Sequence, residues 1–164
     1  MIGPIAYIAV CVLLIIVALV MTFKSKRYAV AVAYAVLCIA GLIAPAELSM
    51  TPLIFWGVAL VAVLVIDMLL PADIAKSNQG LGYIAGGGAV GMFIGLLIPA
   101  VVLCTATGAI LGGIAYAKTP EGKPLEFPSS KFLSYLCAKG FPAVIAICII
   151  GVSISWLLPD FMAE

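Results

Sequence analysis

Two ionisable side chains, Asp67 and Lys139, stand in or beside long apolar runs of the sequence, where their charge could serve a function. A charged group inside a membrane is costly, so such residues are candidates for functional roles. Each residue stands near the end of its apolar run, at a membrane depth that water also reaches. The alternative to a functional role is that water at the interface simply solvates the charge. Because their depths match, we hypothesise that they pair and hold the third run against the last.

Other catalytic or metal-binding chemistry has little support in the sequence. Histidine is absent, which removes the commonest general base and transition-metal ligand. The five cysteines stand alone in apolar stretches with no C-x-x-C pair, as small buried hydrophobes do. There is no nucleophile with a base, no Walker loop and no dinucleotide fingerprint. We expect no enzymatic activity, no metal and no cofactor, and eight Lys and Arg are too few for a nucleic-acid interface.

The most informative spacing belongs to glycines between positions 81 and 117. They recur at every fourth residue in two arms around Pro99, namely Gly87, Gly91 and Gly95, then Gly108 and Gly112 with Gly113 beside it. Missing side chains on one helical face let a second backbone approach closely. Each glycine costs a helix roughly 0.5–1 kcal/mol relative to alanine. The large number of glycines in this segment therefore indicates a structural role. The pattern predicts tight packing of the two arms, with an oligomer interface or a channel-lining helix as the alternative.

The composition requires an apolar solvent around the chain. Of its 164 residues, 66% are hydrophobic and 9% are charged, whereas soluble domains are near half apolar and a quarter charged. Apolar runs extend over 5–23, 28–44, 52–70, 81–117 and 141–158. We therefore expect a single integral membrane domain, 1–164. The first run follows no basic segment, and we expect it to be a retained span, not a cleaved signal.

The positive charges indicate how often 81–117 crosses the bilayer. If it is a hairpin turning near Pro99, all eight Lys and Arg lie on one face. If it crosses once, Lys118, Lys123 and Lys131 lie on the opposite face. Loop lysines and arginines favour the cytoplasm, so we predict the hairpin, either fully spanning or re-entrant. The prediction is an all-α polytopic protein of a bacterial inner membrane, with about six membrane segments and both termini outside.

The stretch before the last run, residues 129–140, mixes polar and apolar side chains. We expect it to form a short amphipathic helix along the membrane interface. Pro142 restricts the residue before it, which predicts a bend at the entrance of the last run.

Several features follow one another in a set order from Asp67 to Gly113. They are an acidic residue and a proline that close a run (Asp67, Pro71), a loop with Lys76, a G-x-x-x-G helix (Gly91, Gly95), Pro99, and a G-A-x-x-G arm (Gly108 to Gly112). This order resembles an uncharacterised bacterial membrane family, the domain of unknown function numbered four-five-six. The family commonly has an acidic residue where this chain has Gly113, and a Pro/Gly-rich first hairpin that 1–50 lacks. The resemblance implies a multi-span membrane protein with no assigned activity.

Two main functions are open at this point. The first is a non-enzymatic membrane protein whose glycine hairpin packs into a compact bundle or homo-oligomer, with the lipid bilayer and a second copy as partners. The second is a small transporter or channel with discontinuous helices along its path. Only Thr105, Thr107 and glycine backbone offer polar lining, which favours lipid-like or small apolar cargo over ions. An enzyme acting on lipid ranks third, since Asp67 has no catalytic partner other than Lys139. We expect the first.

Overall fold

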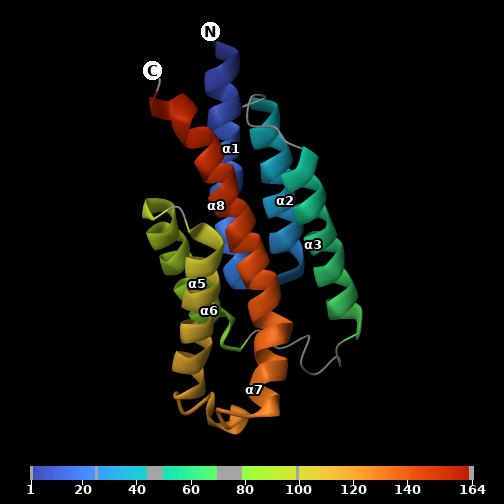
Figure 1. The fold of residues 1–164 in the computed structure, drawn as a ribbon, viewed down its shortest axis with the longest axis vertical. Helices are drawn as coiled ribbons and strands as arrows, with labels where there is room; N and C mark the ends of the chain where they lie inside the picture. The colour runs from blue at the N-terminus through green and yellow to red at the C-terminus, as the bar shows by residue number, and fades with distance from the viewer. Residues whose placement is uncertain (1, 25, 44–49, 70–78, 99, 163–164) are drawn as a thin grey trace.

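The computed structural model describes residues 2–24, 26–43, 50–69, 79–98 and 100–162 (Figure 1). The helices are α1 (Ile2–Lys24), α2 (Lys26–Ile43), α3 (Met50–Leu69), α5 (Leu81–Leu97), α6 (Val101–Ala117), the 3-10 turn η1 (Lys123–Leu125), α7 (Ser130–Tyr135), the π-helical segment η2 (Leu136–Gly140) and α8 (Phe141–Met162). These parts of the chain contain no strand, so the predicted all-helical class is confirmed. Pro71, Lys76, Pro99 and the loop around Glu47 lie outside the described residues.

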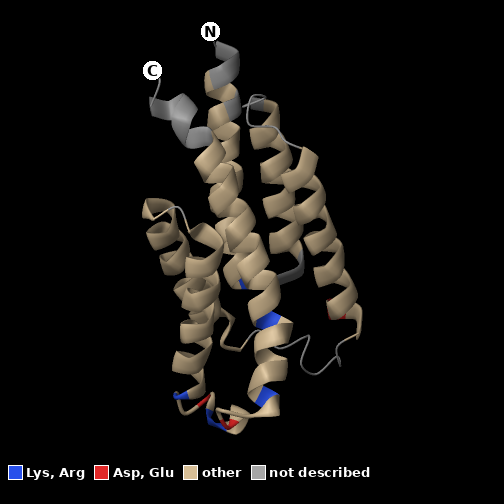
Figure 2. Ribbon diagram, viewed as in Figure 1, with Lys and Arg blue, Asp and Glu red and all other residues tan. Residues whose placement is uncertain are grey.

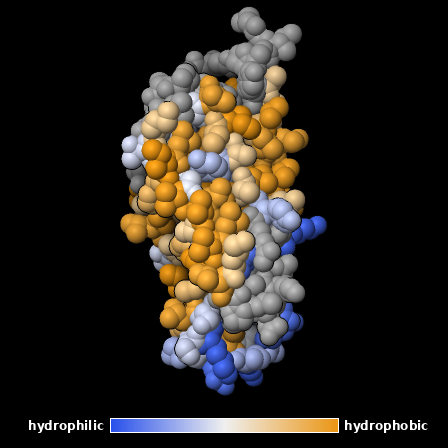
Figure 3. Space-filling view, turned by 90° about the vertical axis from the view of Figure 1, so that its right-hand side faces the viewer, coloured by the Kyte–Doolittle hydropathy of each residue, from blue (hydrophilic) through white to orange (hydrophobic). Residues whose placement is uncertain are grey.

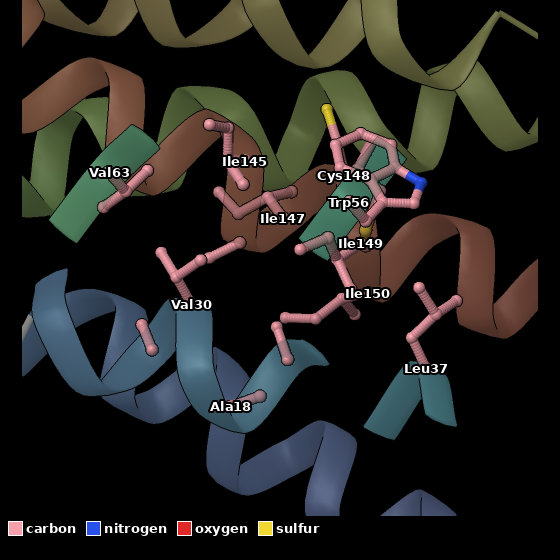
Figure 4. Packing of buried hydrophobic residues seen from close by; sticks show 14 residues of the cluster. Ala18, Val30, Leu37, Trp56, Val63, Ile145, Ile147, Cys148, Ile149 and Ile150 are labelled. Carbon is pink, nitrogen blue, oxygen red and sulfur yellow. The ribbon is translucent and has the colours of Figure 1, made fainter. Parts of the chain in front are cut away.

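The helix α8 forms the centre of the bundle (Figure 1). It packs against α1, α2 and α3 and also against the α5–α6 hairpin. The beginning of α1 and the end of α8 lie at the same end of the molecule. Aliphatic side chains fill the space between α8 and its neighbours, as Figure 4 shows for Val30, Leu37, Val63, Ile147 and Ile150. Burial of these side chains fixes the position of α8.

Two helices are long and apolar enough to cross a membrane, judged by length and composition within the described residues. They are Met50–Leu69 and the continuous helix Ser130–Trp156. The hairpin helices α5 and α6 have 17 residues each, which at 1.5 Å per residue gives about 25 Å, short of a hydrocarbon core of about 30 Å. The structure therefore contains two helices of spanning length within the described residues. The larger number of six membrane segments stays a prediction.

The last helix begins earlier than the sequence pattern predicts. The helix α7 runs through η2 into α8, so 130–156 form one helix and no separate interfacial helix is present there. Pro142 lacks an N–H, and its ring crowds the carbonyl one turn earlier. In η2 the helix widens, and the Phe141 N–H donates to the Leu136 carbonyl five residues back. The predicted bend is thus a wider helical turn.

The charged residues of the described ribbon lie in the half of the molecule opposite the chain termini, and several of them gather at its end (Figure 2). Hydrophobic residues cover much of the described face in Figure 3, and hydrophilic ones lie mainly at that same end, with a smaller group at mid height. Large apolar side chains are exposed along α1 and α3, for example Leu13, Phe55 and Met68. Contiguous apolar surface on this scale is unusual for a protein in water. Along the long axis of the molecule, the described surface thus consists of a mainly apolar body followed by a charged end.

Candidate functional site

The two arms of the hairpin approach so closely that backbone meets backbone. A Cβ atom built on Gly87 would fall on the Gly108 carbonyl, and one on Gly108 would fall on the Gly87 carbonyl. A Cβ on Gly91 would meet the Cys104 carbonyl in the same way. The arms are antiparallel, and dispersion between their backbones replaces contacts between side chains.

The same contact continues toward both ends of the hairpin. A Cβ on Gly95 would lie 2.6 Å from the Val101 Cα, and one on Gly112 would fall on the Tyr83 carbonyl. At the tip, the Ile98 N–H donates to the Ile94 carbonyl at 3.2 Å and the Ala100 N–H donates to the Gly95 carbonyl at 2.9 Å. These bonds use backbone groups that the helix ends leave unpaired.

Gly113 has a different neighbour from the other predicted packing glycines. Its Cβ would lie 3.2 Å from Leu136 Cδ1 of η2, whereas the nearest atom of α5, Ile84 Cγ1, is 3.8 Å away. Two further glycines have comparable roles that the sequence pattern did not single out. A Cβ on Gly88 would lie 2.9 Å from Ile147 Cδ1, and one on Gly151 would lie 2.6 Å from Val101 Cγ1. Gly151 is the single glycine in the last apolar run, 141–158. A glycine alone among large apolar residues is the sequence feature that could have indicated a close contact there.

The outer face of the hairpin carries an apolar groove of about 650 Å³, which we call the outer groove. Gly86, Gly87, Val90, Leu103 and Leu111 are among the residues that line it. No atom lies within 4 Å of a Cβ built on Gly86 or Gly82, so both positions face open space within the described structure. The Thr107 hydroxyl in this groove donates to the Leu103 carbonyl of its own helix at 2.7 Å, and Thr105 is fully buried.

A second hollow, of about 460 Å³, lies at the base of the hairpin beside η1 and α7, and we call it the basal pocket. Its lining includes Gln79, Tyr116, Glu121, Lys131, Tyr135 and Lys139. Unlike the outer groove, it combines charged, hydroxyl and aromatic groups. This combination suits an amphipathic or charged ligand.

The buried lysine of the basal pocket owes its position to the π-helical segment. Lys139 lies within η2 and is only 3% exposed. Its Nζ donates to the Gln79 carbonyl at 2.7 Å and lies 5.1 Å from the centre of the Tyr135 ring. A lysine over a tyrosine face is stabilised by the ring quadrupole. Pro142, through η2, therefore places a positive charge inside the molecule, as π-bulges often do at functional sites.

Three tyrosines from three helices stack at the mouth of the hairpin. The Tyr116 ring lies 5.6 Å from the Tyr135 ring at an interplanar angle of 25°, and 5.6 Å from the Tyr83 ring at 44°. Gly80 makes room for this stack. It has a φ of 74°, and a Cβ there would lie 2.6 Å from the Tyr116 ring and would overlap the Tyr135 hydroxyl.

Asp67 is buried near the end of α3, away from the lining of both hollows. Lys139 contacts Gln79 and Tyr135 in the basal pocket, and its pairing with Asp67 stays a prediction. Within the ranges that the structure covers, no three His, Cys, Asp or Glu side chains come together in a way that could hold a metal ion.

The described residues form a helical bundle with a closely packed glycine hairpin and a polar pocket at its base. Comparison with known proteins adds no relative, since no family model, no curated protein and no solved structure matches this chain. The resemblance from Asp67 to Gly113 therefore stays a prediction.

Proposed function

We propose that the chain is a small polytopic protein of a bacterial inner membrane, non-enzymatic, whose glycine hairpin locks the helices into a compact bundle. The observation that carries the proposal is the backbone contact at Gly87, Gly91 and Gly108, where no side chain fits between the arms. In lipid, helices associate through such close approach because lipid removes most of the hydrophobic drive between them. The exposed apolar body of the molecule supports lipid as its solvent.

The hairpin is re-entrant in this proposal. Large apolar side chains are exposed on its tip half, such as Val90, Phe93, Leu97 and Leu103. In the base half, over 81–89 and 109–117, the exposed large apolar side chains of the described surface are fewer, namely Tyr83, Ile110 and Leu111. A hairpin that dips from one face and returns to it needs apolar surface only near its tip. Its helices are also too short to span comfortably.

Labelling of single cysteines tests whether 81–117 returns to the membrane face from which it starts. In a variant with the five native cysteines replaced, we expect Lys26→Cys and Lys123→Cys to react with an impermeant maleimide from the cytoplasmic face. Glu47→Cys is expected to react from the outside and serves as the matched control. If positions 26 and 123 react from opposite faces, the segment 81–117 crosses the membrane once, is not a hairpin, and the proposal is wrong.

A homo-oligomer is the other form of this function, and the outer groove is the face where a second copy would pack. We expect the mass in mild detergent to correspond to one chain of 16.9 kDa plus detergent. Gly86→Leu projects into the open groove and leaves the hairpin contact intact, so the mass is expected to stay unchanged. A wild-type oligomer that Gly86→Leu dissociates, with the fold preserved by circular dichroism, would instead assign the hairpin to oligomer formation.

A further inference from the structure

The outer groove is apolar over most of its length. Val90, Leu103 and Leu111 line it and are all exposed. Its Thr107 hydroxyl is already bonded to the Leu103 carbonyl and does not require a polar partner. Within the described structure, no atom lies within 4 Å of a Cβ built on Gly86. A molecule in the groove therefore gains chiefly apolar contact.

The base end of the groove leads to a positive charge. The lining residues of α6 include four on one face of the helix, at spacings of four, three and four positions, namely Cys104, Gly108, Leu111 and Ala115. Lys118, three positions after Ala115, continues this face at the end of α6 with helical backbone angles. Helix side chains lean toward the N-terminus, so the Lys118 side chain leans toward the groove. The groove thus has an apolar length and a cationic end.

Lys118 is available to a ligand. It is exposed, and among the described residues its ammonium group forms no ion pair. The two acids that follow it lie elsewhere, since Glu126 is 4.0 Å from Lys131 and Glu121 lines the basal pocket and not the outer groove. With Lys123, the charges from 118 to 131 sum to +1. Charge complementarity therefore favours an anionic group at the base end of the groove.

The groove has the length and the direction of a lipid chain in one leaflet. At 1.5 Å per residue, its lining from Tyr83 to Ile94 extends over about 16 Å. One leaflet contributes about half of a hydrocarbon core of about 30 Å. Tyr83 lies at the base end, where a tyrosine ring suits the level of the headgroups, and Ile94 and Leu103 lie at the apolar tip end.

A second copy of the chain fits the groove less well than a lipid. A two-fold dimer brings the same surface of both copies together, so one groove would face another groove, and two hollows do not fill each other. Copies that share one orientation in the membrane would also place their two Lys118 side chains at the same depth. Like charges at that position oppose the contact, whereas an anionic headgroup is attracted.

We infer that the outer groove binds one acyl chain of an anionic phospholipid of the cytoplasmic leaflet, with Lys118 beside the headgroup phosphate. The inference rests on the proposed function, which places the base of the hairpin at the cytoplasmic surface and its tip within the membrane. A lipid of that leaflet already has its headgroup at the level of the base and its chains directed toward the tip.

Retention of phosphatidylglycerol by the full chain in mild detergent tests the inference. Native mass spectrometry of the delipidated protein compares phosphatidylglycerol with phosphatidylethanolamine of the same acyl chains. We expect the wild type to retain phosphatidylglycerol in preference. Gly86→Leu places a side chain in the groove and is expected to lose most of the bound lipid.

Gly82→Leu is the matched control for the groove, because Gly82 also faces open space on α5 but does not line the groove. It is expected to retain lipid like the wild type. Circular dichroism verifies that both leucine variants keep the helical fold.

Lys118→Gln tests the headgroup contact. It is expected to weaken binding of phosphatidylglycerol about fivefold, the effect of one lysine beside an anionic headgroup, and to leave phosphatidylethanolamine unchanged. Lys123→Gln removes the same charge from η1, beyond the end of α6, and is expected to have a smaller effect.

Equal retention of phosphatidylglycerol by Gly86→Leu and Gly82→Leu would place the lipid outside the groove and overturn the inference. An equal response of the two phospholipids to Lys118→Gln would overturn the headgroup assignment. A protein mass that falls to one chain only in Gly86→Leu would assign the groove to a second copy instead. These readouts are made in detergent and do not depend on topology, so their failure is distinguishable from a failure of the cysteine labelling at positions 26 and 123.

Discussion

Gly91→Ala is expected to destabilise the protein by about 3 kcal/mol, at the upper end of the usual cost of overpacking. The added methyl group would overlap the Cys104 carbonyl, and that oxygen belongs to a helix backbone that cannot rotate away as a side chain can. The arms of the hairpin must then separate, which also loosens the contacts of Gly87 with Gly108. Unfolding in detergent, followed by far-UV circular dichroism during an SDS titration, measures the change.

The sign of the effect makes this test decisive. In an exposed helix, alanine in place of glycine stabilises by roughly 0.5–1 kcal/mol. Gly86→Ala lies on the same helix with open space around its Cβ and is the matched control, expected to be neutral or slightly stabilising. If both variants are equally stable, the arms do not pack as described.

Gly80→Ala is expected to have a second large effect, at the base of the hairpin. Alanine at a φ of 74° costs roughly 1–2 kcal/mol in the backbone alone. Its methyl group would overlap the Tyr135 hydroxyl and the Tyr116 ring, which adds roughly 1–3 kcal/mol. We expect a lower unfolding midpoint and a changed near-UV circular dichroism signal, since the tyrosine stack must shift.

Gly82→Ala provides the comparison for Gly80→Ala, because it lies two residues further along in open space. It should retain the near-UV signal of the wild type and at least its stability. A Gly80→Ala variant with unchanged stability and unchanged tyrosine signal would show that the segment before α5 is not held as the structure describes.

The helical class and the glycine positions of the hairpin contact could be predicted from the sequence because both follow from one-dimensional rules. Apolar runs set the class, and a four-residue spacing puts Gly87, Gly91 and Gly95 on one face of a helix. Spacing alone does not say which neighbour a face meets. Gly112 and Gly113 are adjacent in sequence but about 100° apart around the helix, so one faces α5 and the other faces η2.

The basal pocket could not be predicted because its parts are distant in sequence. Lys139 was singled out for its depth, but its contacts with Gln79 and Tyr135 depend on the π-helical turn and on the return of the hairpin. Pro142 indicated that the helix is irregular near this position, but not in which way, because a proline can kink a helix, end it or widen it. Gly80 gave no local sign that two tyrosines would crowd it.

The π-helical segment also sets the rotational phase of the last helix. An inserted residue turns everything beyond it by about 100° relative to an uninterrupted α-helix. Phe132 and Tyr135 before the insertion pack against the base of the hairpin. After it, Ile147 and Ile150 lie in the core shared with α1 and α2, while Gly151 adjoins Val101 of the hairpin. The π-helical turn thereby sets which face of α8 meets each of these neighbours. Loss of one residue between 136 and 140 would preserve the helix and misalign one of its two halves.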